Sequence, residues 1–199
     1  AKNAYEKMYP ASTTKLMTAI LTLENCKLTD TAIVSHNAIY SIPVGYSHAS
    51  LKEDEELTIE QLLNVLLIPS ANDAAIVLAE HISGSVEKFS KLMNEKAKSL
   101  GCLNTNFVNP NGIQNKNHYS TAYDLALIGK YALKFPDIKR IAMVKQYTLP
   151  TTNKYDKTDR IFNATNGLIN DDVLNKNYYE YATGLKTGYT DASGYCIVS

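Results

Sequence analysis

Two side chains near the start of the chain could act together as a nucleophile and its base. Ser12 and Lys15 lie three residues apart where helical periodicity begins, so both project from one face within mutual reach. A serine hydroxyl is a weak nucleophile until a base takes its proton, and a lysine can do so only when burial or a nearby cation lowers its pKa. The helix start adds a positive dipole end that favours the developing alkoxide. The spacing therefore predicts a lysine-activated serine.

The same S-x-x-K spacing occurs a second time, at Ser85 and Lys88. There we interpret the serine as a helix cap and the lysine as a solvated charge. Spacing alone therefore does not distinguish the two pairs. Only the motifs that accompany Ser12 and Lys15 can do so.

Ser70 and Asn72 follow Pro69 in a predicted break between two apolar helices, where rigid flanks can hold polar side chains in a cleft. Ser70 would relay a proton towards the leaving group, and Asn72 would donate to a substrate carbonyl. The alternative is an ordinary helix start, because S-x-N also recurs at 35–37.

Lys186, Thr187 and Gly188 occur in a strand-like segment. The glycine would let a substrate approach the backbone, the threonine would bind a substrate carboxylate, and the lysine would supply positive potential. That potential would also lower the pKa of Lys15. The alternative is a charged strand end followed by a turn glycine.

S-x-x-K, a serine-asparagine motif and K-T-G in this order are the signature of penicillin-binding proteins and class A β-lactamases. With their surroundings, the motifs resemble those of the low-molecular-mass serine D-alanyl-D-alanine carboxypeptidases over essentially the whole chain. The segments that carry the resemblance are 9–19, 69–75, 107–112, 119–124 and 184–190.

The resemblance implies an α+β fold of the β-lactamase/transpeptidase type, with a helical cluster packed on an antiparallel sheet and further strands before Ala1 and after Ser199. Residues 1–199 would be a single, partial catalytic domain. Ser12 would attack the peptide between the terminal D-alanines of a peptidoglycan stem, and water would hydrolyse the acyl-enzyme. Penicillins and other β-lactams would acylate the same serine.

In such enzymes the oxyanion would lie between the backbone N–H groups of Ser12 and Tyr189. Family members often have histidine after K-T-G, so Tyr189 is a departure that keeps the backbone donor and changes the side chain. The resemblance also implies an extracytoplasmic protein, on the cell-wall side of a bacterial cytoplasmic membrane.

Other functions remain open beside the carboxypeptidase. A β-lactamase needs rapid deacylation, often through a dedicated glutamate, and the 119–124 region offers none in an evident position. A D,D-endopeptidase would use the same catalytic residues. A non-catalytic wall-binding descendant is disfavoured by the retention of Ser12, Lys15, Asn72 and Lys186.

Helices must position the first two motifs and a strand the third. Apolar periodicity predicts helices over 12–26, 58–68, 72–82 and 85–100, and another after Ser120 or Thr121 with Leu125, Leu127, Ile128 and Tyr131 inside. Thr58 and Gln61 form a capping-box signature at the start of the 58–68 helix. Gly101 is predicted to end the 85–100 helix. Aromatic and β-branched segments predict strands at 147–149, 160–165, 181–187 and 195–198.

Composition excludes several classes of function. Net charge is zero without a basic run, so nucleic acid is not expected as a partner. Three widely spaced cysteines indicate neither a disulfide framework nor a zinc site, and we expect no metal and no cofactor. The acidic run 53–56 is interpreted as a solvated loop. No apolar run reaches the roughly 20 residues of a membrane span, so membrane association would use regions outside this segment.

Overall fold

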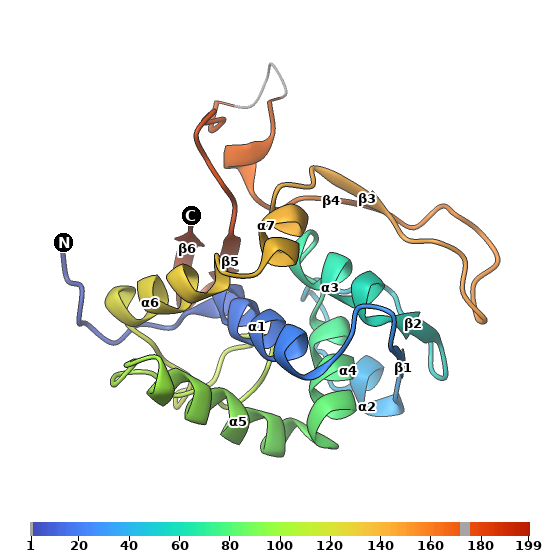
Figure 1. Cartoon of the computed structure of the whole chain (residues 1–199), viewed down its shortest axis with the longest axis horizontal. Coiled ribbons are helices and arrows are strands. Elements are labelled where there is room, and N and C mark those ends of the chain that lie inside the picture. Colours follow the sequence, from blue (N-terminus) through green and yellow to red (C-terminus); the bar gives the residue numbers. More distant parts are fainter. Residues whose placement is uncertain (1, 172–175) are drawn as a thin grey trace.

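The computed structural model describes residues 2–171 and 176–199, and a helical cluster built around one central helix dominates it. Figure 1 shows that helix, α1 (Lys15–Asn25), with α3, α4, α5 and α6 around it. The other described helices are α2 (His36–Tyr40), α3 (Ile59–Leu67), α4 (Asn72–Ser83), α5 (Val86–Ser99), α6 (Ala122–Ala132) and α7 (Pro136–Ala142), with two 3₁₀ turns, η1 (Ala11–Thr14) and η2 (Gly167–Ile169).

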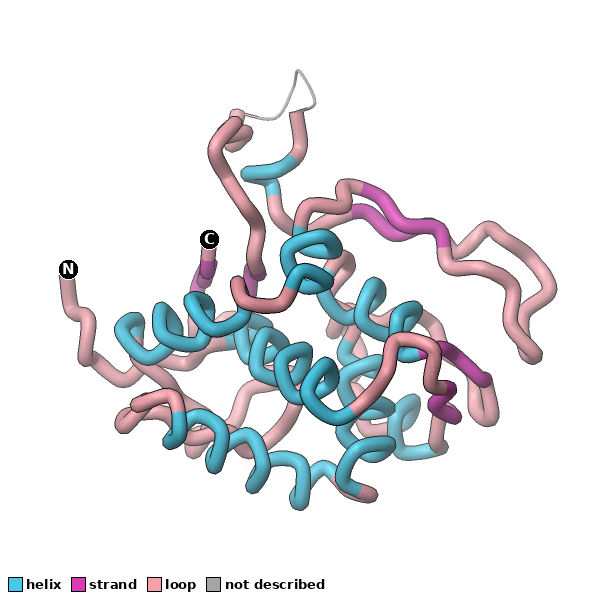
Figure 2. Tube along the Cα trace, viewed as in Figure 1, coloured by secondary structure: helices cyan, strands magenta, loops and turns pink. Residues whose placement is uncertain are grey.

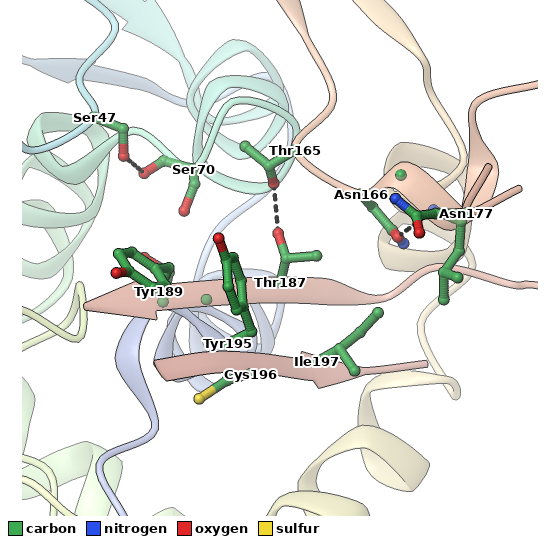
Figure 3. A pocket seen from close by; sticks show the side chains of 14 residues that line it. Ser47, Ser70, Thr165, Asn166, Asn177, Thr187, Tyr189, Tyr195, Cys196 and Ile197 are labelled. Atoms are coloured by element: carbon green, nitrogen blue, oxygen red, sulfur yellow. Dashed lines mark hydrogen bonds between the residues drawn. The ribbon is translucent and has the colours of Figure 1, made fainter. Parts of the chain in front are cut away.

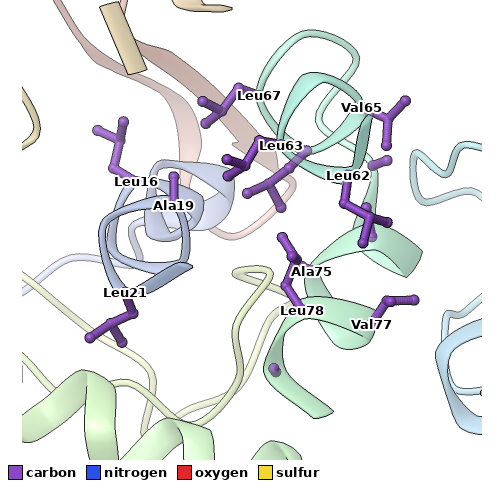
Figure 4. Close-up of a cluster of buried hydrophobic side chains, with 14 of the residues drawn as sticks. Leu16, Ala19, Leu21, Leu62, Leu63, Val65, Leu67, Ala75, Val77 and Leu78 are labelled. Carbon is purple, nitrogen blue, oxygen red and sulfur yellow. The ribbon is translucent and has the colours of Figure 1, made fainter. Parts of the chain in front are cut away.

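The apolar core lies where α1 meets α3 and α4. Leu16 and Ala19 of α1 lie across from Leu63 of α3, and Ala75 of α4 lies below Leu63 (Figure 4). All four side chains are fully buried. Because two sides of α1 are buried in this core, the residues at its start are held rigidly.

Among the described residues, the strands form three short two-stranded antiparallel sheets (Figure 2). They are β1 (Thr31–Ile33) with β2 (Glu56–Thr58), β3 (Gln146–Thr148) with β4 (Ile161–Asn163), and β5 (Lys186–Thr190) with β6 (Gly194–Val198). The β5–β6 hairpin packs against η1, with Gly188 opposite Cys196 in register. Helices and antiparallel strand pairs together confirm the predicted α+β class.

The predicted helices of the first half are confirmed almost to the residue. Thr58 caps α3 and exchanges both hydrogen bonds of a capping box with Gln61. Ser85 caps α5 by accepting from the Lys88 N–H at 3.2 Å. Thr121, one of the two predicted caps, caps α6 by accepting from the Asp124 N–H. In α6 only Ile128 of the four predicted interior residues is fully buried; Leu125, Leu127 and Tyr131 are half-buried.

Several short elements were not predicted. Helix α7 was not predicted, and it begins at Pro136 because proline suits the first position of a helix. The sequence also gave no indication of α2, β1 and β2, which have only three to five residues each. The predicted strand over 181–187 is wrong before Lys186, where β5 starts. The strand predicted at 147–149 begins and ends one residue earlier, and the one predicted at 160–165 is shorter, at 161–163.

The acidic run 53–56 is not wholly a solvated loop. Glu55 is fully buried and forms an ion pair with Arg160, from Nη2 to Oε1 at 2.5 Å. The Thr152 hydroxyl donates to the same carboxylate at 2.6 Å, and these bonds hold its pKa below the ordinary value against the effect of burial. The prediction failed because the partners lie about a hundred residues further along the chain.

No helix among residues 2–171 and 176–199 is long and apolar enough to cross a membrane. In the same residues, no three His, Cys, Asp or Glu side chains are grouped so that they could hold a metal ion.

Candidate active site

Ser12 and Lys15 contact each other, as their spacing predicted. Ser12 lies in η1, one turn before α1, and Lys15 is the first residue of α1. The Lys15 Nζ lies 2.9 Å from the Ser12 Oγ, 2.8 Å from the Asn72 Oδ1 and 2.7 Å from the carbonyl oxygen of Asn111. The amine therefore has three oxygen neighbours, of which only the serine hydroxyl can also donate.

The environment of Lys15 favours the neutral amine. Its side chain is fully buried, and this burial lowers its pKa well below the usual value. The charge of Lys186 lowers the pKa further, whereas the carboxylate of Asp73 raises it. A neutral amine has two N–H groups for the two carbonyl oxygens, which leaves its lone pair facing the hydroxyl of Ser12.

Ser70 and Asn72 stand beside this pair in the break between α3 and α4. Ser70 has a φ of 68°, a left-handed conformation that costs free energy in a non-glycine residue. Its hydroxyl is buried without a hydrogen-bond partner among the described residues. Asn72 accepts from Lys15 and donates its amide to the Ser47 carbonyl oxygen at 2.7 Å. The structure thus brings Asn72 to Lys15 and places Ser70 in a cavity that Ser12 also lines, while donation from Asn72 to a substrate stays a prediction.

Strand β5 brings the third motif against the start of α1. A Cβ on Gly188 would lie 2.8 Å from the backbone nitrogen of Ser12, so only glycine permits this approach. Lys186 is buried, its Nζ donates to the Thr187 carbonyl at 3.0 Å, and burial lowers its pKa to about 7. Tyr189 follows with an exposed side chain whose ring packs on Tyr195, at 4.8 Å between centroids.

The turn 109–112 completes the wall behind Lys15. It supplies the Asn111 carbonyl, and its Gly112 has a φ of 84°. A Cβ there would lie 1.9 Å from the carbonyl oxygen of Ala11, the residue before Ser12. Residues 109–112, which the sequence analysis named only within a segment that carries the resemblance, therefore help to fix the position of the nucleophile.

Other residues at the site were missed by sequence reasoning. The Thr165 hydroxyl lies 2.6 Å from that of Thr187 (Figure 3), and Ser47 donates to the Ser70 carbonyl at 2.8 Å. His118 is buried, and its Nε2 lies 2.8 Å from the Thr14 hydroxyl. Burial and the nearby Lys15 lower the His118 pKa to about 4, so the ring is neutral at pH 7. These contacts join residues far apart in sequence and leave no local signal.

Two cavities open on either side of Ser12. One, of about 480 Å³, is lined by Ser70, Thr165, Leu168 and Thr187 among others, and several of these are labelled in Figure 3. The other, of about 350 Å³, is lined by Asn72, Tyr46 and Asp191 among others. Ser12, Ser47 and Tyr189 line both. A chain laid along β5 would therefore pass over the nucleophile.

The second S-x-x-K pair, Ser85 and Lys88, lies away from the other motifs. Lys88 is exposed on α5, and Ser85 is half-buried and serves as the cap. The structure thus separates the two pairs as the sequence analysis expected.

Comparison with known proteins gives consistent matches along the chain. The family model Peptidase_S11, described as D-alanyl-D-alanine carboxypeptidase, matches residues 1–199. The chain is 38% identical over 203 residues to the D-alanyl-D-alanine carboxypeptidase DacF of Bacillus subtilis, covering 100% of this chain and 49% of that protein. It is 36% identical over 206 residues to DacC of Escherichia coli, covering 99% and 48%. The chain thus spans about half the length of these curated relatives.

A solved structure supports the same relationship. The crystal structure of the Streptomyces K15 DD-transpeptidase superposes with a TM-score of 0.88 and 32% identity, over 98% of this chain and 76% of that one.

Proposed function

The chain belongs to the Peptidase_S11 family of D-alanyl-D-alanine carboxypeptidases, and on that premise we propose that it carries the active site of a serine D,D-carboxypeptidase. The enzyme removes the terminal D-alanine from peptidoglycan stem peptides through an acyl-enzyme on Ser12. The observation that carries the proposal is the buried Lys15 amine, 2.9 Å from the Ser12 Oγ with its other contacts on two carbonyl oxygens.

Acylation follows from that geometry. The neutral Lys15 amine takes the Ser12 proton as the Oγ forms a bond to the substrate carbonyl carbon. The backbone N–H groups of Ser12 and Tyr189 stabilise the oxyanion. When the C–N bond breaks, the departing amine takes a proton, which Ser70 passes from Lys15. Water then attacks the ester with Lys15 again as the base, releasing the shortened peptide and restoring Ser12.

The cavity with Thr187 is suited to the departing D-alanine. The hydroxyls of Thr165 and Thr187 lie 2.6 Å apart, so they can face the two oxygens of one carboxylate. Lys186, buried behind them, adds positive potential. Gly188 lets the substrate backbone lie close to β5. A free chain end is thereby distinguished from a peptide bond within a chain.

The wider setting is proposed on the same grounds. Peptidoglycan stem peptides are the substrate, and β-lactams such as penicillin acylate Ser12 as covalent inhibitors. Residues 1–199 are part of a single catalytic domain that acts on the cell-wall side of the bacterial cytoplasmic membrane.

Covalent labelling tests the proposal. The intact protein is incubated with a labelled penicillin and a D-Ala-D-Ala peptide in separate reactions, and the modified residue and the released D-alanine are measured. Ser12→Ala should abolish both. Ser85→Ala is the matched control at the second S-x-x-K and should lose only a helix cap, about 1 kcal/mol of stability. Penicilloyl found on Ser85, or on no serine of the folded protein, would overturn the assignment.

A further inference from the structure

Thr18 is a buried residue of α1 that the proposed reaction does not use. It lies three residues after Lys15, on the same face of the helix, and its side chain is fully buried. The Thr18 hydroxyl donates to the carbonyl oxygen of Pro110 at 2.6 Å. The Lys15 Nζ lies 2.7 Å from the carbonyl oxygen of the next residue, Asn111. One face of α1 therefore holds two consecutive carbonyl groups of the turn 109–112.

The Thr18 hydroxyl is directed away from its own helix. A threonine inside a helix can donate to the carbonyl oxygen four residues earlier. Thr22 does so, with its hydroxyl 2.8 Å from the Thr18 carbonyl oxygen, and it is as deeply buried in α1. Thr18 instead bonds to a residue 92 positions away in the sequence. This bond therefore links the helix to the turn.

The turn connects this bond to the carbonyl group that contacts the base. The Asn111 carbonyl and the Gly112 N–H belong to one planar peptide unit, and that N–H donates to the Asn109 Oδ1 at 2.8 Å. Asn109 also donates from its Nδ2 to the Ile113 carbonyl oxygen at 2.9 Å. The preceding peptide unit carries the carbonyl that Thr18 holds. Hydrogen bonds thus fix the peptide units on both sides of Asn111.

Another contact anchors the chain just before the turn. The Val108 N–H donates to the His118 Nδ1 at 3.1 Å, and the His118 Nε2 lies 2.8 Å from the Thr14 hydroxyl. This anchor precedes Asn111 by three residues, so rotation about the intervening backbone bonds can still turn the Asn111 carbonyl. Thr18 holds the residue directly before Asn111 and therefore controls the direction of that carbonyl.

The direction of the Asn111 carbonyl matters because Lys15 must present a lone pair. A neutral amine has two N–H groups and one lone pair. When Asn72 Oδ1 and the Asn111 carbonyl oxygen accept the two N–H groups, the lone pair faces the Ser12 Oγ at 2.9 Å. If one acceptor is displaced, the amine can rotate and direct an N–H group at Ser12. An amine in that orientation cannot take the serine proton.

We propose that Thr18 is a positioning residue for the base, because its hydroxyl holds the 109–112 turn where Lys15 presents its lone pair to Ser12. The inference rests on the proposed function and adds a residue from outside the substrate cavities. Thr18 lines neither of the two cavities beside Ser12. Its loss should therefore slow the chemical step and leave the binding of penicillins unchanged.

Acylation kinetics of the intact protein test this inference. Stopped-flow traces at increasing concentrations of a fluorescent penicillin give the saturating rate of acylation and the dissociation constant of the initial complex. A displacement of about 1 Å at a reacting group can cost about a hundredfold in rate, and the turn keeps its other contacts, so we expect Thr18→Val to lower the saturating rate about tenfold. The dissociation constant should not change. Thr18→Ser keeps the hydroxyl and should restore the rate.

Thr22→Val is the matched control, because it removes an equally buried hydroxyl that bonds within the helix. It should be acylated at the parent rate. Thr18→Ala also lacks the hydroxyl and repeats the test if Thr18→Val does not fold. The parent rate in either Thr18 variant, a loss confined to the dissociation constant, no recovery in Thr18→Ser, or an equal fall in Thr22→Val would overturn the inference alone. A folded parent that penicillin does not acylate would overturn the proposed function and the inference with it.

Discussion

Substitution of Gly112 by alanine should displace the nucleophile without touching a catalytic side chain. Gly112 has a φ of 84°, and an added Cβ would lie 1.9 Å from the Ala11 carbonyl oxygen and 2.4 Å from its carbon. Real Cβ contacts are essentially never under 3.0 Å, so the two backbone segments must separate by about 1 Å. Ser12 follows Ala11 directly and must move with it.

Gly112→Ala should have two effects, a loss of stability and a loss of acylation rate. The left-handed conformation itself costs an alanine about 1–2 kcal/mol of stability. A displacement of about 1 Å at a reacting group costs on the order of a hundredfold in rate, or about 2.7 kcal/mol. Gly84→Ala is the matched control, because Gly84 has a φ of 75° with nothing within 4 Å of the added Cβ. That variant should show only the stability loss and should acylate at the parent rate.

Thermal melts and the second-order rate of acylation by a fluorescent penicillin measure the two effects separately. We expect Gly112→Ala to lose more stability than Gly84→Ala and to acylate about a hundredfold more slowly. Acylation of Gly112→Ala at the parent rate, with a stability loss no larger than that of Gly84→Ala, would refute the reasoning that this glycine fixes the nucleophile.

Three further predictions concern charged groups. Lys15→Arg should abolish acylation in a folded protein, because arginine keeps its proton, whereas Lys88→Arg at the second motif should acylate normally; label incorporation measures both. Lys186 has a folded pKa of about 7 and an unfolded one near 10.4. Between these pH values the unfolded chain binds the extra proton, so stability rises with pH. Denaturant titrations from pH 7 to 10 should show a smaller rise for Lys186→Met. Arg160→Met leaves the buried Glu55 carboxylate without its counter-ion and should lower the free energy of unfolding by about 3–5 kcal/mol. Arg140→Met, in an exposed pair, should lower it by under about 1 kcal/mol. Equal losses in denaturant titrations would contradict this account.

Helices were predictable where local chemistry determines them. The capping box at Thr58 and Gln61 fixed the start of α3, and Pro69 marked its end. The elements that escaped prediction are short and depend on distant partners. Strand β2, for example, begins directly after Glu55, whose buried carboxylate forms an ion pair with Arg160, next to β4. No periodicity within a few residues could carry that information.

The motifs located the nucleophile, its base and the strand beside them, but not the surfaces that receive the substrate. The Thr165 hydroxyl contacts that of Thr187 across 22 residues, and Asp191 lines a different cavity beside Ser12 from the one that Thr187 lines. A threonine or an aspartate alone has no distinctive spacing. Site residues of this kind can be identified only from the tertiary structure.

The two S-x-x-K pairs show what converts a spacing into chemistry. Both place a serine and a lysine at a helix start, and in the second the serine hydroxyl accepts the Lys88 N–H while the lysine remains in water. In the first, burial removes water from Lys15, and carbonyl oxygens from Asn72 and Asn111 occupy two N–H groups. Those partners lie 57 and 96 residues away. The reactivity of Ser12 is therefore a property of the packed core and of the two loops that close on it, and the motif supplies only the atoms.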